Sequence, residues 1–173
     1  MKTIYLLRHA KSSWQDQELE DIKRPLSKRG RAAAKAMAAY LSAQGIVPGQ
    51  ILCSPALRTR QTLEHMEAKL DAAIPVRFEK GIYNADAASL LRRLRRLSDG
   101  LSSVMVIGHN PGLETLALML ISEGEATARD RLATKYPTGT LAILTAAIPH
   151  WRDLGPESAR LEAFVRPKDL LSR

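Results

Sequence analysis

Two histidines and two arginines lie within a few residues of the ends of short apolar runs, in the polar segments that follow them. Arg8 and His9 follow one such run, His109 follows a second, and Ser54 follows a third, with Arg58 four residues further on. Apolar runs of this length and composition predict buried β-strands. Because ligands bind beyond the carboxyl ends of strands in open α/β sheets, we expect these side chains to converge at one edge of a sheet.

Such a set of side chains suits the transfer of a phosphoryl group. The guanidinium forks of Arg8 and Arg58 match the oxygens of a phosphate in bidentate geometry. A neutral imidazole is a competent covalent nucleophile, and surrounding cations lower its pKa so that it stays unprotonated near neutral pH. Phosphoryl transfer depends mainly on positioning and charge neutralisation, so we expect this arrangement to need no metal or other cofactor.

The elements that position these residues alternate along the chain between strand patterns and helix patterns. We expect strands at about 3–7, 50–53, 76–79, 103–107, 140–145 and 161–165, and helices at about 27–43, 57–70, 87–97 and after residue 110. Ser27 is expected to cap the first helix and Gly45 to end it. Asn110 is expected to cap the last helix, with Pro111 at its first position. The alternation predicts an α/β fold, in which a mostly parallel sheet lies between helices and the late strands pair antiparallel.

The composition narrows the class of protein further. The chain has 173 residues and a net charge of +8, which favours anionic partners, but only 5% of its residues are aromatic. Few aromatic side chains provide few platforms for base stacking, so we expect no nucleic-acid partner. The apolar runs are shorter than the roughly 18 residues of a membrane span, and the N-terminus lacks the pattern of a signal peptide. Because Cys53 is the single cysteine, no internal disulfide is possible, and we expect a cytoplasmic protein with no membrane partner.

Three motifs resemble those of the histidine phosphatase superfamily, which includes phosphoglycerate mutases. Leu7-Arg8-His9-Ala10-Lys11 resembles its Arg-His-Gly signature, residues 54–62 resemble its Ser-x-x-x-Arg-x-x-x-Thr motif, and Val106-Ile107-Gly108-His109-Asn110 resembles its strand that ends in histidine. The short chain and Arg24-Pro25-Leu26-Ser27 are most similar to SixA-type phosphohistidine phosphatases. The resemblance implies a three-layer α/β/α sandwich of the phosphoglycerate mutase type, with residues 1–173 forming one histidine phosphatase domain.

The resemblance also implies roles for the matched residues. His9 is expected to be the nucleophile, which becomes phosphohistidine and is then hydrolysed. Arg8 and Arg58 are expected to bind phosphate oxygens, and His109 to donate a further hydrogen bond to the phosphoryl group. Ser12, in the loop after the nucleophile, is a candidate for contacting the substrate.

The sequence departs from the family pattern at two positions. Ala10 replaces the usual glycine after the nucleophile, so we expect ordinary backbone angles there. Gly81 stands where phosphoglycerate-mutase-like members place a glutamate that donates a proton, and Glu79 and Asp86 are candidate substitutes nearby. An alkoxide leaving group resembles deprotonated water, whose pKa is about 15.7, and needs such a donor. An imidazole, with a conjugate-acid pKa of about 6.5, departs with far less help.

The missing acid favours a phosphorylated protein as the substrate, namely phosphohistidine on a histidine phosphotransfer domain of a signalling phosphorelay. Three alternatives remain open at this stage. The first is a phosphomonoesterase of broad specificity for small phosphate esters, and the second is a non-catalytic adaptor that binds phosphate. The third is a nucleic-acid-binding module, which predicts binding that depends steeply on salt. Cys53 ends an apolar run, so we interpret it as a core residue rather than a nucleophile.

Overall fold

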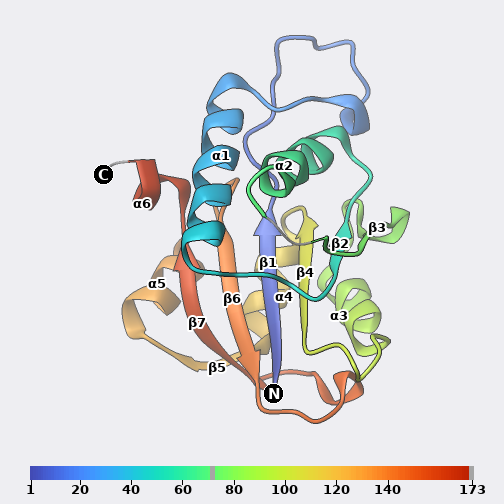
Figure 1. The fold of residues 1–173 in the computed structure, drawn as a ribbon, viewed down its shortest axis with the longest axis vertical. Coiled ribbons are helices and arrows are strands. Elements are labelled where there is room, and N and C mark those ends of the chain that lie inside the picture. The colour runs from blue at the N-terminus through green and yellow to red at the C-terminus, as the bar shows by residue number, and fades with distance from the viewer. Residues whose placement is uncertain (71–72, 172–173) are drawn as a thin grey trace.

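The computed structural model describes residues 1–70 and 73–171, in which seven strands form one central sheet in the order β3-β2-β4-β1-β6-β7-β5 (Figure 1). The strands are β1 Lys2–Arg8, β2 Ile51–Cys53, β3 Val76–Phe78, β4 Ser103–Gly108, β5 Ile121–Gly124, β6 Leu141–Ala146 and β7 Ala159–Val165. β6 runs antiparallel to both of its neighbours, and the other pairings are parallel. The prediction of a mostly parallel sheet with antiparallel late strands is therefore confirmed.

Helices cover both faces of the sheet, which gives the three layers of an α/β/α sandwich (Figure 1). They are α1 Lys28–Ala43, α2 Leu57–Glu67, α3 Ala87–Arg95, α4 Gly112–Leu120, α5 Ala126–Thr134 and α6 Pro167–Leu171. Side chains of α1 and α2 form a core with one face, and side chains of α3, α4 and α5 form a core with the other. None of the helices in the described ranges combines the length and the apolar character that a membrane crossing demands.

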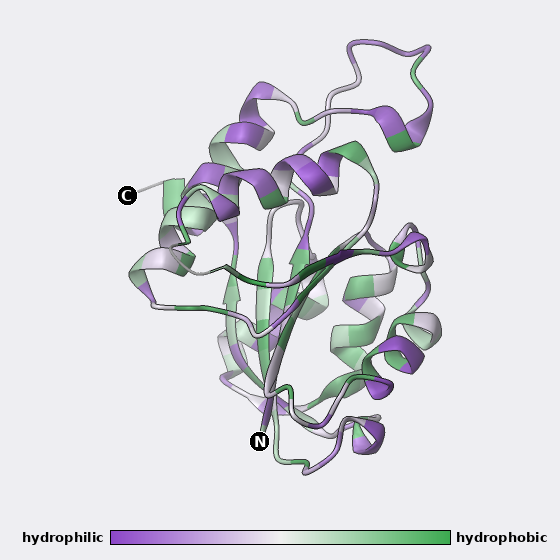
Figure 2. Cartoon of the chain, turned by 45° about the vertical axis from the view of Figure 1, so that its right-hand side comes forward, coloured by the Kyte–Doolittle hydropathy of each residue, from purple (hydrophilic) through white to green (hydrophobic). Residues whose placement is uncertain are grey.

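The two central strands carry apolar side chains on both faces, as a buried parallel strand must. Figure 2 shows these hydrophobic residues gathered on the strands, while the helices mix hydrophobic and hydrophilic residues. β1 and β4 pair in parallel, and their register places Arg8 opposite Gly108. The next residue of each chain segment is a histidine, so the pairing brings His9 and His109 to the same edge of the sheet.

The first helix, α1, is attached by hydrogen bonds to the loop that follows β1. The Ser27 hydroxyl accepts a hydrogen bond from the Gly30 backbone N–H at 3.0 Å, which confirms the predicted N-cap. The Lys11 carbonyl accepts from the Ser27 backbone N–H at 2.8 Å. A Cβ atom on Gly30 would lie 2.0 Å from the Lys11 carbonyl oxygen, so this close approach requires glycine. At the other end of α1, Gly45 adopts a φ of +65° and terminates the helix as predicted.

Three local predictions need correction. α2 ends at Glu67, three residues before the predicted end at Leu70. α4 begins at Gly112 with Pro111 as the flanking residue, although the Asn110 side-chain oxygen still accepts from the Glu114 backbone N–H at 3.3 Å. Neither β5 nor α5 is predicted by the sequence pattern, because β5 is four residues long with only one large apolar side chain, and α5 buries a single leucine. Such patterns are too weak to indicate an element without its neighbours.

Candidate active site

His9 and His109 lie side by side at the carboxyl edge of the central strands. Their ring centroids are 5.3 Å apart, and their side-chain environments are nearly closed, with 7% and 4% of each residue exposed. His9 Nδ1 is 2.6 Å from the Ala10 carbonyl oxygen. Because a carbonyl oxygen only accepts, Nδ1 carries the proton and donates this hydrogen bond. The lone pair of the ring therefore resides on Nε2, which makes no hydrogen bond to any described residue.

The backbone at Ala10 is held from a second side. The Ala10 N–H donates to the Thr62 hydroxyl oxygen at 3.1 Å, and that hydroxyl donates to the Arg58 carbonyl in α2 at 2.8 Å. Ala10 is absent from the few positive-φ positions of the described chain, so the expected ordinary backbone angles are confirmed. The carbonyl that fixes the His9 tautomer is thus anchored to α2.

His109 has the opposite tautomer. An Arg58 guanidinium nitrogen lies 3.3 Å from His109 Nδ1, and since a guanidinium only donates, Nδ1 is the acceptor. Nε2 then carries the proton and donates to the Ser54 hydroxyl oxygen at 2.8 Å. Tyr83 contacts the His109 ring edge-on, with the centroids 5.4 Å apart. The second histidine therefore spans from Ser54, after β2, to Arg58 on α2.

Burial and neighbouring charge keep both imidazoles neutral. Burial, together with the charges of Arg58, Arg8 and Arg24, lowers the pKa of His9 to about 4 against the opposing effect of the Ala10 hydrogen bond. Burial likewise lowers the pKa of His109 to about 3, with contributions from His9 and Arg58. At neutral pH the His9 Nε2 lone pair is therefore available for nucleophilic attack.

Three guanidiniums and the two histidines share one cavity of about 490 Å³. It is lined by Arg8, His9, Lys11, Ser12, Trp14, Arg24, Arg58, Asn84, His109, Asn110, Lys135, Pro137 and Thr138. This lining contains five cationic side chains and, within the described residues, no carboxylate. Both Arg8 and Arg58 retain a buried Nε–H that lacks a partner in the described chain. A cavity with these properties is built to bind a multiply charged anion.

Arg24, for which the sequence alone indicates no role, lines the same cavity. Its guanidinium donates to the Ser12 hydroxyl at 2.8 Å and lies 3.6 Å from the centroid of the exposed Trp14 ring. Ser12 is thereby turned toward the cavity edge rather than left on the surface. The only sequence signal for Arg24 is its place in the segment Arg24-Pro25-Leu26-Ser27, on which the SixA resemblance rests.

Asp21 is a second residue that sequence reasoning missed. One of its carboxylate oxygens accepts from Arg24 at 2.9 and 3.2 Å, and the other accepts from Arg58 at 3.0 Å and from the Tyr83 hydroxyl. The Asp21 carbonyl accepts from the second terminal nitrogen of Arg58 at 2.8 Å. These hydrogen bonds outweigh the opposing effect of burial and hold the pKa of Asp21 well below its usual range. A permanent carboxylate thus orients two of the three guanidiniums.

The structure does not bring the two candidate proton donors into the cavity. Both Glu79 carboxylate oxygens accept from Arg93 on α3, at 2.7 and 2.9 Å, and this pairing lowers the Glu79 pKa. Asp86 is the N-cap of α3 and accepts from the Ser89 backbone N–H at 2.8 Å, which lowers its pKa. Each carboxylate has a structural partner, and neither lines the cavity.

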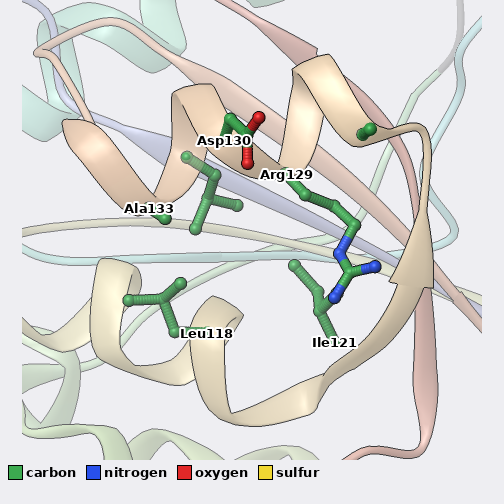
Figure 3. A pocket seen from close by; sticks show the side chains of 7 residues that line it. Leu118, Ile121, Arg129, Asp130 and Ala133 are labelled. Carbon is green, nitrogen blue, oxygen red and sulfur yellow. The ribbon is translucent and has the colours of Figure 1, made fainter.

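Two other features lie apart from this site. Cys53 is fully buried at the end of β2, and burial raises its pKa to about 12, in agreement with a core role. A separate cavity of about 380 Å³ lies between α4, β5 and α5, where Leu118, Ile121, Arg129 and Asp130 surround it (Figure 3). It shares no lining residue with the histidine site.

Comparison with known proteins gives a consistent set of relatives. Residues 4–93 match the family profile of the histidine phosphatase superfamily (branch 1). An uncharacterized protein of Mycobacterium tuberculosis is 35% identical over 164 residues, which cover 94% of this chain and all of that protein. A crystal structure of a candidate phosphohistidine phosphatase, SixA from Agrobacterium tumefaciens, superimposes with a TM-score of 0.82 at 30% identity, covering 96% of this chain and 98% of that one. A SixA candidate from Nakamurella multipartitia gives 0.79 at 27% identity, covering 96% of each chain.

Proposed function

This chain belongs to the histidine phosphatase superfamily and is a phosphatase, and we propose that it hydrolyses phosphohistidine on a protein through a covalent phospho-His9 intermediate. The observation that carries the proposal is the His9 tautomer, because the Ala10 carbonyl holds the Nδ1 proton and leaves the Nε2 lone pair in the cationic cavity. The two solved relatives are described as candidate phosphohistidine phosphatases, which supports the choice of substrate.

The first step transfers the phosphoryl group to His9. The Nε2 lone pair attacks phosphorus, a new N–P bond forms, and the N–P bond of the substrate breaks. The electron pair of that bond stays on the substrate nitrogen, and the substrate imidazole leaves as a neutral ring because its other ring nitrogen carries a proton taken from solvent. Arg8, Arg24 and Arg58 neutralise the charge on the phosphoryl oxygens throughout the transfer.

The second step regenerates the enzyme. A water molecule attacks phosphorus, the bond to His9 Nε2 breaks, and its electron pair returns to the ring while the proton of the water passes to the phosphate released. In the His109 tautomer of the structure, Nδ1 accepts from Arg58 rather than offering a proton to the cavity. For His109 to donate to a phosphoryl oxygen, as the family resemblance implies, either its Nε2–H leaves Ser54 for the anion or its Nδ1 gains a proton when the anion binds.

The distribution of carboxyl groups favours a nitrogen leaving group. Glu79 and Asp86 are held by structural partners outside the cavity, and Asp21 is held ionised between two arginines. No described carboxyl group is therefore placed to protonate an alkoxide. An imidazole, with a conjugate-acid pKa of about 6.5, takes up a proton from solvent near neutral pH and departs as a neutral ring without such a donor. Because guanidiniums supply the positive charge, we also propose that turnover requires no divalent metal ion.

The proposal is tested by trapping the intermediate. We expect alkaline-quenched wild-type protein, mixed with a protein phosphohistidine substrate, to carry phosphate on the His9 peptide in mass spectrometry. His9→Ala should show no phosphopeptide and lose at least about a thousandfold in kcat, since a covalent route needs its nucleophile. Activity should persist in excess EDTA. Steady turnover by His9→Ala would refute the assignment.

The substrate class is tested by kinetics on matched substrates. We expect kcat/KM for protein phosphohistidine to exceed that for a sugar phosphate by two or more orders of magnitude, because the alkoxide lacks a proton donor. Equal values would instead favour the small-molecule phosphomonoesterase. Phosphate binding with no turnover of either substrate would favour the adaptor.

A further inference from the structure

A second pocket opens directly beside the histidine site. It has a volume of about 490 Å³ and shares Lys11, Pro137 and Thr138 with the catalytic cavity, so the two hollows have a common wall. Its other boundaries come from the first turns of α1, including Arg29, and from α6 at the end of the described chain, including Leu171. The mechanism proposed above uses none of this second pocket.

The common wall is fixed to the strand that carries the nucleophile. The Gly139 backbone N–H donates to the Arg8 and His9 carbonyls at 3.1 and 2.8 Å, which ties the segment after Pro137 to the end of β1. On the opposite side, the Lys11 carbonyl is held by Ser27, at the start of α1. The position of the second pocket relative to His9 is therefore set by backbone hydrogen bonds rather than by mobile side chains.

The second pocket is apolar inside and cationic at its edge. Alanine and proline side chains, together with the half-exposed Leu171, provide the apolar surface. Arg166 is neutralised by Asp169, to which it donates at 2.8 and 3.0 Å. Lys11 and Arg29 have no ion pair within the described chain, and the lining contains no carboxylate among the described residues. The lining contains no aromatic residue either, so it offers no surface on which a nucleotide base stacks.

We propose that this second pocket binds an acidic segment of the substrate protein, adjacent to its phosphorylated histidine. The inference rests on the proposed function, because only a macromolecular substrate extends from the catalytic cavity across Pro137 and Thr138. Asp or Glu side chains of the segment face Lys11 and Arg29, and an apolar side chain of the same segment packs against Leu171 in the pocket. The pocket thereby selects which phosphorylated protein reaches His9.

The test compares a protein substrate with a small one in the same variant. In Arg29→Glu, we expect kcat/KM for the phosphohistidine protein to fall about tenfold through KM, with kcat unchanged. Turnover of phosphoramidate, which reaches only the catalytic cavity, should stay within twofold of the wild type. Added salt at 0.5 M should reduce the difference between variant and wild type, because screening weakens interactions between exposed charges. Arg29 is exposed in the first turn of α1, where an acidic side chain suits the helix dipole, so the variant should fold.

Arg152→Glu provides the matched control. It makes the same change in net charge at an exposed position in the 3-10 helix Trp151–Asp153, and Arg152 belongs to neither lining. We expect this variant to keep the wild-type kcat/KM for both substrates. If it lost as much kcat/KM for the phosphohistidine protein as Arg29→Glu does, the docking inference would be overturned. The docking inference would also be overturned if the wild type hydrolysed the phosphohistidine protein and Arg29→Glu hydrolysed it equally well. A wild type inactive on that protein but active on small phosphates would instead refute the proposed function itself.

Discussion

The chemistry of this protein depends on which nitrogen of each histidine carries the proton. His9 and His109 are both buried and both neutral, yet their hydrogen-bond partners impose opposite tautomers. A carbonyl oxygen makes His9 Nδ1 a donor, whereas a guanidinium makes His109 Nδ1 an acceptor. One ring therefore presents a lone pair to the cavity, and the other is engaged on both sides by protein groups.

Also at the scale of single residues, Asp21 holds the guanidiniums of Arg24 and Arg58 in position. Asp21→Asn removes the charge that accepts from Arg24, Arg58 and Tyr83, and hydrogen bonds to an ionised acceptor are about twice as strong as neutral ones. We expect kcat/KM to fall about tenfold with the fold intact, since misplaced guanidiniums stabilise the transition state less well. Steady-state kinetics and circular dichroism measure the two parts of this prediction.

A carboxylate outside the cavity provides the control for that experiment. Asp86→Asn should keep its full activity, because asparagine caps a helix as well as aspartate does and Asp86 does not line the cavity. If Asp21→Asn instead bound inorganic phosphate more tightly and lost no activity, Asp21 would merely oppose anions and would not position the arginines.

At the scale of elements, the loop after β1 and the first turn of α1 behave as one unit. The Lys11 carbonyl accepts from Ser27, and its oxygen occupies the space that a side chain on Gly30 would need. The Thr62 hydroxyl joins this loop to α2 through Ala10 and Arg58. His9, the proposed nucleophile, is therefore positioned by the contact of three elements rather than by β1 alone.

Gly30→Ala tests the contact between the loop and α1. Alanine is normally about 1 kcal/mol better than glycine inside a helix. Here we expect the opposite sign, a loss of roughly 1–3 kcal/mol in the free energy of unfolding, because the new Cβ collides with backbone and forces α1 or the loop to move. Urea denaturation measures the change, and kcat/KM should fall with it.

Gly155→Ala is the matched control for this substitution. A Cβ atom there meets nothing within 4 Å, so we expect the unfolding free energy to change by less than about 0.5 kcal/mol. A stabilised Gly30→Ala variant would mean that the loop yields easily and does not hold His9 in place.

At the scale of the whole molecule, the buried imidazoles make stability depend on pH. The pKa values of His9 and His109 are lowered in the folded protein to about 4 and about 3, from an ordinary value of 6.5. The unfolded chain therefore binds more protons than the folded one below pH 6.5, so stability is highest above that value. It is lost as the pH falls from 6.5 toward the folded values.

We expect the free energy of unfolding to fall by up to about 2 kcal/mol for each histidine between pH 6.5 and 5, since one unit of pKa difference corresponds to about 1.4 kcal/mol. Urea denaturation at a series of pH values measures this slope. A variant carrying His9→Gln and His109→Gln should have a flatter profile across the same interval, whatever its stability at pH 7. If the double variant lost as much free energy of unfolding as the wild type over this interval, neither buried imidazole would cause the loss of stability in acid.

The sequence by itself determined most of the strands and helices and the order of the strand-end motifs, although β5 and α5 were missed. Apolar periodicity in β1 and β4 and the cap at Ser27 are local patterns, so the α/β fold and the segments that carry Arg8, His9, Arg58 and His109 were predictable. Parallel strands end at one edge, which is why residues a hundred positions apart were expected to meet.

Only the tertiary structure decided the parts of the site that depend on the path of irregular chain. Asp21 and Arg24 lie in a polar loop without periodicity, and their place beside Arg58 follows from how that loop folds back over α2. The tautomers of the two histidines could not be predicted from the sequence either, because each depends on a hydrogen-bond partner that only folding brings near. The second pocket exists only because α1, α6 and the segment at Pro137 come together in space. Local patterns specify elements, whereas contacts between loops depend on the whole packed arrangement.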